Sequence, residues 1–240
     1  MSHDLNALDQ PIGFAVPDWV PPPVPPRAAL VGHFCRVAPL DAGRHAAELH
    51  TANCADTAER MWTYLPYGPF ATHAAYTSWA ERMAAMPDPQ FYAIIDATSG
   101  QARGVASYLR IDPPAGSIEV GHIAYSPALQ RTPAATEAMY LLMQQVFALG
   151  YRRYEWKCDA LNARSRAAAQ RLGFTFEGIF RQATVYKGRN RDTAWYAIID
   201  RDWPALHAAY MHWLAPDNFD EHGQQRTSLS LLIAQARSDT

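Results

Sequence analysis

The alternation of hydrophobic and polar residues along the 240-residue chain predicts seven strands and five helices. Apolar, β-branched and aromatic residues at every second position indicate strands, and apolar residues at every third to fourth position indicate helices. The predicted strands are residues 33–37, 91–96, 103–111, 117–126, 151–159, 176–186 and 193–199. The predicted helices are residues 41–53, 72–86, 134–149, 162–172 and 203–214. This order predicts a mixed α/β domain built around one sheet.

The fourth predicted strand carries two polar residues that a catalytic site would need. Strict alternation places Ile118, Val120, His122 and Ala124 on one face, and Glu119, Gly121, Ile123 and Tyr125 on the other. Glu119 and His122 are therefore expected on opposite faces, although a bulge within the strand would change this assignment.

The first 32 residues differ from the rest of the chain. Six prolines lie between positions 17 and 26, and proline fixes φ and removes a backbone donor. We expect an extended, polyproline-like arm. It is either a tether that lies on the domain, anchored by Phe14 and Trp19, or a ligand for an SH3-type domain. The chain is thus divided into an arm (1–32), a domain (33–202) and a C-terminal helical tail (203–240).

Composition and charge exclude several classes of protein. An apolar share of 49% and a charged share of 18% are those of a globular chain, which argues against disorder. The net charge of −2 provides no positive field for nucleic acid. No apolar run reaches the roughly 18 residues that span a membrane, so no membrane partner is expected.

Cysteine and histidine patterns argue against disulfides and metals. The three cysteines, Cys35, Cys54 and Cys158, are odd in number and widely spaced, which favours a reducing, cytoplasmic location. The first four residues also lack the features of a signal peptide. Two histidine pairs, 45/50 and 207/212, are five residues apart rather than the three or four of helical ligand pairs, so no metal is predicted.

A candidate anion-binding segment follows the fourth predicted strand. Unpaired N–H groups and the dipole at a helix N-terminus attract anions, and small residues let a diphosphate approach closely. The small residues here are Thr132, Ala134 and Ala135. Pro133 lacks an N–H but suits a first helical turn, and Arg131 adds a positive charge. From these features alone the segment is either a diphosphate site or a plain strand-to-helix connection.

The same segment resembles the phosphate-binding motif Q/R-x-x-G-x-G/A of the GNAT superfamily of N-acetyltransferases. Gln130 and Ala135 match, whereas Pro133 replaces the middle glycine and removes one amide contact. Further similarity to the branch of RimJ- and RimL-type protein N-terminal acetyltransferases lies in Thr136-Glu137-Ala138, Asn162, Ser165, Leu172-Gly173-Phe174 and Glu177-Gly178. The resemblance spans about residues 33–200. It implies a mixed, mostly antiparallel sheet of about seven strands, with helices on both faces and the fourth and fifth strands splayed.

The resemblance implies acetyl-CoA as the co-substrate and names the residues that would bind it. Its pantetheine would pair with the fourth strand as an added strand would, and its diphosphate would lie over the following helix N-terminus. The implied set is Ile123, Ala124, Tyr125, Ser126, Gln130, Arg131, Thr132, Pro133, Ala134, Ala135, Thr136, Asn162 and Ser165. Asn162 is also a plausible helix N-cap.

Candidate catalytic residues follow from the chemistry of acyl transfer to an amine. The reaction needs a neutral amine and a proton for the departing thiolate. Glu119 and His122 are candidate bases, the alternatives being a paired carboxylate and a core histidine. Many GNAT members use a tyrosine seven residues after the helix-opening asparagine as the acid, but Ala169 stands there. Ser165 is the carried-over candidate for a hydrogen bond to the thiolate.

An aromatic loop is expected to line the acceptor side. It contains Trp62, Tyr64, Tyr67 and Phe70, which otherwise form a lid packed on the core. The predicted function is transfer of an acetyl group to a primary amine, either a protein N-terminus or a small molecule. The alternative is a non-catalytic acyl-CoA sensor on the same fold. Self-association into a homodimer is compatible with the sequence.

Overall fold

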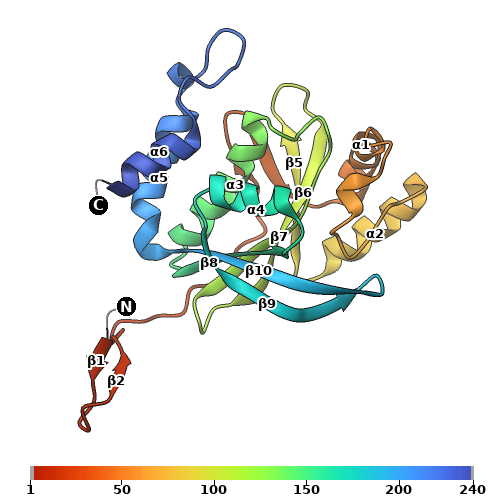
Figure 1. Cartoon of the computed structure of the whole chain (residues 1–240). Helices are drawn as coiled ribbons and strands as arrows, with labels where there is room; N and C mark the ends of the chain where they lie inside the picture. The colour runs from red at the N-terminus through yellow and green to blue at the C-terminus, as the bar shows by residue number, and fades with distance from the viewer. Residues whose placement is uncertain (1–2, 239–240) are drawn as a thin grey trace.

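A computed structural model describes residues 3–238; residues 1–2 and 239–240, at the ends of the predicted arm and tail, lie outside the described residues. The domain is built on one eight-stranded sheet with the order β3-β4-β5-β6-β7-β8-β10-β9 (Figure 1). Only β7 and β8 pair in parallel; the other neighbours are antiparallel. The mixed, mostly antiparallel fold is confirmed. Its eighth strand, β3 (Leu30–Val31), was not predicted.

The predicted strands and helices are present with small changes in their bounds. The strands are β4 (Cys35–Pro39), β5 (Gln90–Asp96), β6 (Ala102–Asp112), β7 (Ser117–Tyr125), β8 (Arg153–Asp159), β9 (Thr175–Tyr186) and β10 (Arg189–Ile199). The helices are α1 (Ala42–Cys54), α2 (His73–Ala85), α3 (Pro133–Ala148), α4 (Ala163–Arg171), α5 (Trp203–Leu214) and α6 (Leu229–Ser238), of which α6 was not predicted. Short 3-10 turns lie at Arg60–Trp62, Asp200–Asp202 and Pro216–Asn218.

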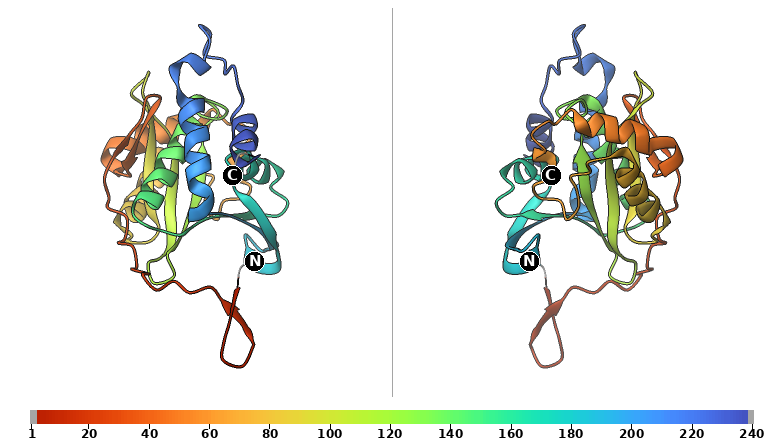
Figure 2. Two further views of the ribbon diagram at one scale, coloured as in Figure 1. Left: turned by 90° about the vertical axis from the view of Figure 1, so that its left-hand side faces the viewer. Right: turned by 90° about the vertical axis from the view of Figure 1, so that its right-hand side faces the viewer.

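Helices cover both faces of the sheet, as Figures 1 and 2 show. Helices α1 and α2 pack on one face over a core that includes Leu49, Trp79 and Phe91. Helix α3, with α5 and α6 behind it, packs on the other face over a larger core that includes Leu142. Helix α3 is apolar on nearly every side because it lies between the sheet and α5. The sheet is therefore buried on both faces at its centre, where β7 and β8 lie.

A bulge in β7 changes which side chains share a face. His122 has φ of 51°, and the register with β6 shifts between the pairs Val105–Ala124 and Ser107–Gly121. One residue of β6 thus opposes two of β7. The alternation holds up to Gly121 and reverses beyond it. Ile123 and Tyr125 pack toward α3, while Ala124 belongs to the core under α1 and α2.

The segments outside the central domain pack differently from one another. Helix α6 inserts Leu229, Leu232 and Ile233 into the larger core, so the C-terminal segment shares the core of the sheet. The arm begins as a hairpin of β1 (His3–Leu5) and β2 (Pro11–Gly13) that projects from the body (Figures 1 and 2). No helix among residues 3–238 is long and apolar enough to cross a membrane.

Candidate active site

Strands β7 and β8 pair along only their first halves and then separate. Their parallel register runs from Ser117–Arg153 to Val120–Trp156, and no later pair joins them within the described residues. Beyond it, residues 121–125 of β7 and 157–159 of β8 flank a gap in the hydrogen-bonding of the sheet. Each strand keeps its other neighbour, β6 or β10, so the sheet stays continuous on both sides. The expected splay is present.

The loop after β7 leads into the N-terminus of α3 through a tight, self-bonded turn. The amides of Leu129 and Gln130 both donate to Ser126 O, at 3.0 and 3.1 Å. Thr132 is the N-cap: its Oγ1 accepts from the amide of Ala135 at 3.2 Å. Pro133 is the first helical residue, the position expected for it.

Two amides in this turn remain available to a ligand. Arg131 has a left-handed φ of 63°, and its N–H, like that of Ala134 in the first turn of α3, has no partner within residues 3–238. A further positive charge lies close by, because Arg171 Nη2 donates to Thr136 Oγ1 at 2.9 Å. The turn therefore combines free N–H groups, a helix dipole and two guanidinium groups, a combination suited to a diphosphate.

Gln130 and Ser126 shape the end of β7. Gln130 Nε2 donates to Tyr125 O at 2.8 Å, so this predicted cofactor-binding side chain ties the loop to the strand. Ser126 is fully buried, and its Oγ has no partner among the described residues. A buried hydroxyl without a partner at the end of the gap fits a site that a polar ligand completes.

Glu137 holds α3 in place from its second turn. Its carboxylate is 3% exposed and accepts the backbone N–H groups of His33, Phe34 and Cys35 at 2.7, 2.6 and 2.8 Å. A Cβ at Gly32 would lie 2.3 Å from the Glu137 carboxyl carbon, so the preceding loop can wrap this closely only with glycine at that position. The start of α3 is thus fixed against β4.

Helix α4 brings two more of the predicted residues to the β8 side of the gap. Asn162 is its N-cap, with Oδ1 accepting from Ser165 N at 3.1 Å. The Ser165 hydroxyl accepts from Trp156 Nε1 at 3.0 Å and lies beside Cys158. Burial raises the pKa of the Cys158 thiol, so it is a poor nucleophile. Ala169, where many GNAT members carry an acidic tyrosine, is fully buried.

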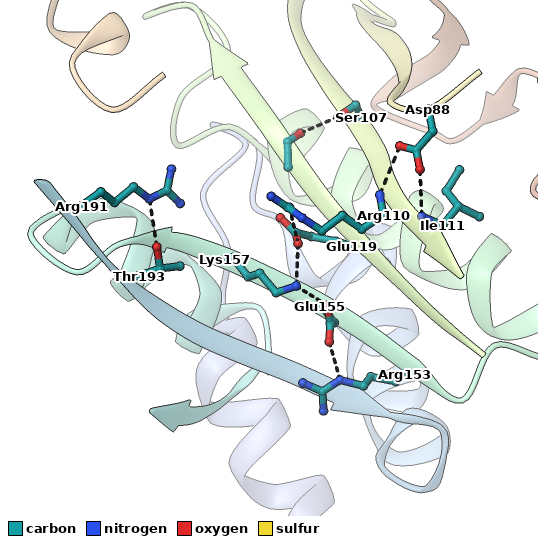
Figure 3. Close-up of polar contacts among 11 residues, drawn as sticks. Asp88, Ser107, Arg110, Ile111, Glu119, Arg153, Glu155, Lys157, Arg191 and Thr193 are labelled. Atoms are coloured by element: carbon teal, nitrogen blue, oxygen red, sulfur yellow. Dashed lines mark hydrogen bonds and ion pairs between the residues drawn. The ribbon is translucent and has the colours of Figure 1, made fainter. Parts of the chain in front are cut away.

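A row of alternating charges crosses the sheet on the α1/α2 face, at the point where β7 and β8 separate (Figure 3). Glu119 Oε2 lies 2.7 Å from Arg110 Nη1 and 3.0 Å from Lys157 Nζ. Lys157 also lies 2.6 Å from Glu155, and its Nζ sits 3.8 Å from the centroid of the Trp195 ring. The row ends with Arg153 and Glu177.

The row was missed in the sequence except for Glu119. Its members on β8, Arg153, Glu155 and Lys157, alternate with apolar residues and share one face. This pattern was the available signal. Their charges alone do not reveal the partners on β6 and β7, which only the strand order brings together.

Glu119 and His122 lie on the same face of the sheet, which corrects the prediction of opposite faces. The bulge turns His122 toward the α1/α2 side, where its ring centroid is 5.1 Å from that of Phe91. Glu119 points to this side as well, because a Cβ at Gly121 would lie 3.5 Å from its Oε1. The physical reason is the bulge, which adds one residue to β7 and so moves every later side chain to the opposite face from the one that strict alternation predicts.

Burial perturbs both groups in the direction that favours their neutral forms. Burial raises the pKa of Glu119, although Arg110 and Lys157 oppose the shift. Burial, assisted by Arg110 and Arg191, lowers the pKa of His122 to about 4. His122 is therefore uncharged at neutral pH, and the Glu119 carboxyl group lies between the two cations Arg110 and Lys157.

The aromatic loop spans both sides of the gap. Tyr67 OH donates to His122 O on β7 at 3.3 Å, and Tyr64 OH donates to Leu161 O before α4 at 3.2 Å. Lys187 Nζ, from the β9–β10 turn, donates to Trp62 O at 2.8 Å. Trp62 lies in the core under α1 and α2, Tyr67 and Phe70 pack against that core, and Tyr67 also stacks on His122. The loop thus covers the α1/α2 side of the gap.

The comparisons identify the family. Residues 36–175 match the acetyltransferase (GNAT) domain family, and the chain belongs to it. A GCN5-related N-acetyltransferase from Brucella melitensis is 48% identical; the match covers 91% of this chain and 100% of that one, with a TM-score of 0.89. A GNAT-family structure from Chromobacterium violaceum is 42% identical, with 81% of this chain and 98% of that one covered and a TM-score of 0.75.

A more distant structure shows the same fold. RimL, an α-N-protein acetyltransferase of ribosomal L7/L12 solved in complex with coenzyme A, is 22% identical, with 71% of this chain and 97% of that one covered and a TM-score of 0.61. No curated protein matches the sequence. The predictions of a GNAT acetyltransferase and of its fold are confirmed.

Proposed function

We propose that this acetyltransferase moves an acetyl group from acetyl-CoA directly to a primary amine. The observation that carries the proposal is the gap between β7 and β8, which has the free amides of the α3 N-terminus at one end and Glu119 at its vertex. In this proposal the nucleotide-linked thioester binds at the α3 N-terminus and extends along β7, and the amine reaches the acyl carbon near Glu119.

The residues around the gap fit coenzyme A. The side of residues 121–125 that faces away from β6 has no strand partner among residues 3–238, so it is available to an extended amide-bearing chain, as in strand addition. The amides of Arg131 and Ala134, with the Arg131 and Arg171 guanidinium groups, are available to the diphosphate. Acetyl-CoA supplies an activated acyl carbon and a thiol leaving group.

The chain's own residues then take part in the proton transfers that the reaction requires. The amine must lose a proton before its lone pair attacks the acyl carbon, and the departing thiolate must gain one. Glu119 accepts the amine proton, directly or through water, because burial raises the pKa of this carboxyl group and so favours proton uptake. Neutral His122 on the same face is the second acceptor. Ser165, whose Oγ already accepts from Trp156, is the donor of a hydrogen bond to the thiolate, which then takes its proton from water.

The test is a thiol-release assay with acetyl-CoA and a panel of amines and N-terminal peptides. Glu119→Gln is expected to lower kcat by about 10²- to 10⁴-fold. It should leave the dissociation constant of coenzyme A unchanged, because the gap and α3 are intact.

Glu177→Gln is the matched control. Glu177 closes the same charge row at its solvent-exposed end, with 38% of its side chain exposed, and contacts Arg153 instead of the gap. It should retain wild-type kcat. Wild-type protein that is not stabilised by coenzyme A, or a Glu119→Gln variant as active as Glu177→Gln, would contradict the proposal.

A further inference from the structure

The β9–β10 hairpin places a cation without a counter-ion beside the gap. Arg191 donates from Nε to Thr193 Oγ1 at 3.2 Å, and its guanidinium lies 5.7 Å from the centroid of the Tyr186 ring. No carboxylate among residues 3–238 lies within ion-pair distance of it. Its terminal nitrogens, Nη1 and Nη2, are therefore available, and such a planar fork suits the two oxygens of a carboxylate.

Arg191 faces the same side of the sheet as the charge row. Arg191, Thr193 and Trp195 alternate along β10 and so share one face. Trp195 is the partner of Lys157 in the β8–β10 register, and Lys157 Nζ lies 3.8 Å from the centroid of its ring. This face is therefore the one on which Glu119 lies, as Figure 3 shows.

The guanidinium of Arg191 lies toward the open end of the gap. The last pair of β8 and β10 at that end is Asp159–Thr193, and Arg191 lies beyond it on the side of the hairpin turn. Its bond to Thr193 turns the side chain back toward the vertex. Burial lowers the pKa of His122 on β7 and raises the pKa of Cys158 on β8, and the charge of Arg191 acts to lower both. Arg191 thus acts on both walls of the gap.

The other charged groups around Arg191 already have partners. The cations of the row are held by its carboxylates. Asp159 accepts from a backbone amide at 2.8 Å and from the hydroxyl of a tyrosine on β9 at 3.0 Å. Asp192 points to the opposite face of β10 and accepts from the amide of Gln182 at 2.7 Å. Lys187, in the turn of the hairpin, donates only to a carbonyl of the aromatic loop, so it is a second cation without a carboxylate.

We propose that the amine acceptor carries a carboxylate and that Arg191 binds it. This inference rests on the proposed function and names the class of acceptor. Thr193, over which the guanidinium folds, and Trp195, beside Lys157, are two residues apart on β10, or about 7 Å. That separation is too long for a carboxylate next to an α-amine and suits an acidic side chain. The source is either a free acidic amino acid or a peptide with an acidic residue near its N-terminus.

The test measures kcat/KM of the full-length protein with acetyl-CoA on two matched pairs of amines. One pair is free glutamate and free glutamine. The other is the C-terminally amidated peptides Ala-Glu-Gly-Tyr and Ala-Gln-Gly-Tyr. The acidic member of at least one pair should be preferred by about tenfold or more, and the pair with the larger ratio identifies the source.

Two substitutions at Arg191 test whether this side chain reads the carboxylate. Arg191→Gln should reduce the preference to about twofold or less, because the charged fork is lost. Arg191→Glu should reverse it, so that Ala-Lys-Gly-Tyr amide becomes a better acceptor than Ala-Glu-Gly-Tyr amide. Tm and the dissociation constant of coenzyme A report whether each variant is folded.

Arg181→Gln is the matched control. Arg181 lies on the same hairpin but lines a shallow pocket with Asp192, on the face opposite Arg191. The substitution removes the same charge and should leave the preference unchanged.

The outcomes separate this inference from the proposed function. Equal kcat/KM for both members of each pair, with measurable turnover, overturns the inference alone. A preference that survives Arg191→Gln also overturns it, as does an equal loss of preference in Arg181→Gln, since the net charge of the hairpin then decides. No turnover with any amine overturns the proposed function and the inference together.

Discussion

Glu137 offers a direct test of how the start of α3 is fixed. Its buried carboxylate accepts the backbone N–H groups of His33 and Phe34, in the loop before β4, and of Cys35, the first residue of β4. Hydrogen bonds to a charged group contribute about 1.5–3 kcal/mol each, and a buried donor left without a partner costs about 1–3 kcal/mol.

Glu137→Gln keeps the shape of the side chain but replaces one acceptor oxygen with a donor. Glu137 Oε1 serves one N–H and Oε2 serves two, so the amide loses at least one bond and places its NH₂ against a backbone N–H. We expect the free energy of unfolding to fall by about 2–4 kcal/mol. Glu137→Ala leaves all three donors unpaired and should cost about 4 kcal/mol or more.

The assay is urea unfolding at neutral pH, with Glu81→Gln as the control for loss of a charge on an exposed helical glutamate. The control should stay within about 0.5 kcal/mol of wild type. A Glu137→Gln variant as stable as the control would refute the reasoning that this carboxylate fixes α3. Because the turn that is free to bind an anion lies at the start of α3, the dissociation constant of coenzyme A should rise in the Gln variant as well.

Three further outcomes follow from buried groups. The pKa of His122 is lowered to about 4, so between its ordinary value and about 4 the unfolded chain binds a proton that the folded chain does not. About 3 kcal/mol of the free energy of unfolding is therefore lost as pH falls through this window. Urea unfolding at neutral and acidic pH should show this loss in wild type but not in His122→Gln. Lys157→Met leaves Glu119 and Glu155 without their shared cation and should cost about 3–5 kcal/mol in urea unfolding, whereas Arg44→Ala, at an exposed pair, should cost less than about 1 kcal/mol. Gly32→Ala meets the Glu137 carboxylate and should lower Tm, while Gly13→Ala, which has open space, should not.

Local patterns were sufficient to predict most of the fold. Asp41 and Thr72, at the predicted starts of the first two helices, cap α1 and α2, with Oδ1 and Oγ1 accepting from the amides of residues three positions on. Strand β3 is two residues long, too short to show an alternating pattern of apolar and polar residues. Helix α6 follows a loop without a clear periodicity, so the sequence did not mark where this helix begins. The hairpin of β1 and β2 was missed because the nearby prolines favour an extended arm.

The site was predictable in its backbone features and less so in its polar network. The α3 N-terminus and the Asn162 cap follow from residues adjacent in sequence. The partners of Glu119 do not, since Arg110 and Lys157 reach it from two other strands. The bulge at His122 also leaves no sign in the sequence, because it depends on how β7 pairs with β6.

The divergence of β7 and β8 has a cost in the resting molecule. In the middle of an otherwise continuous sheet, the amides and carbonyls of residues 121–125 that face away from β6 have no strand to pair with among residues 3–238. An extended occupant that replaces this neighbour would tighten the whole domain, so catalysis and rigidity are coupled through the same backbone. Hydrogen exchange at these amides should therefore be fast in the free protein and slow with coenzyme A, which makes the centre of the sheet its most responsive part.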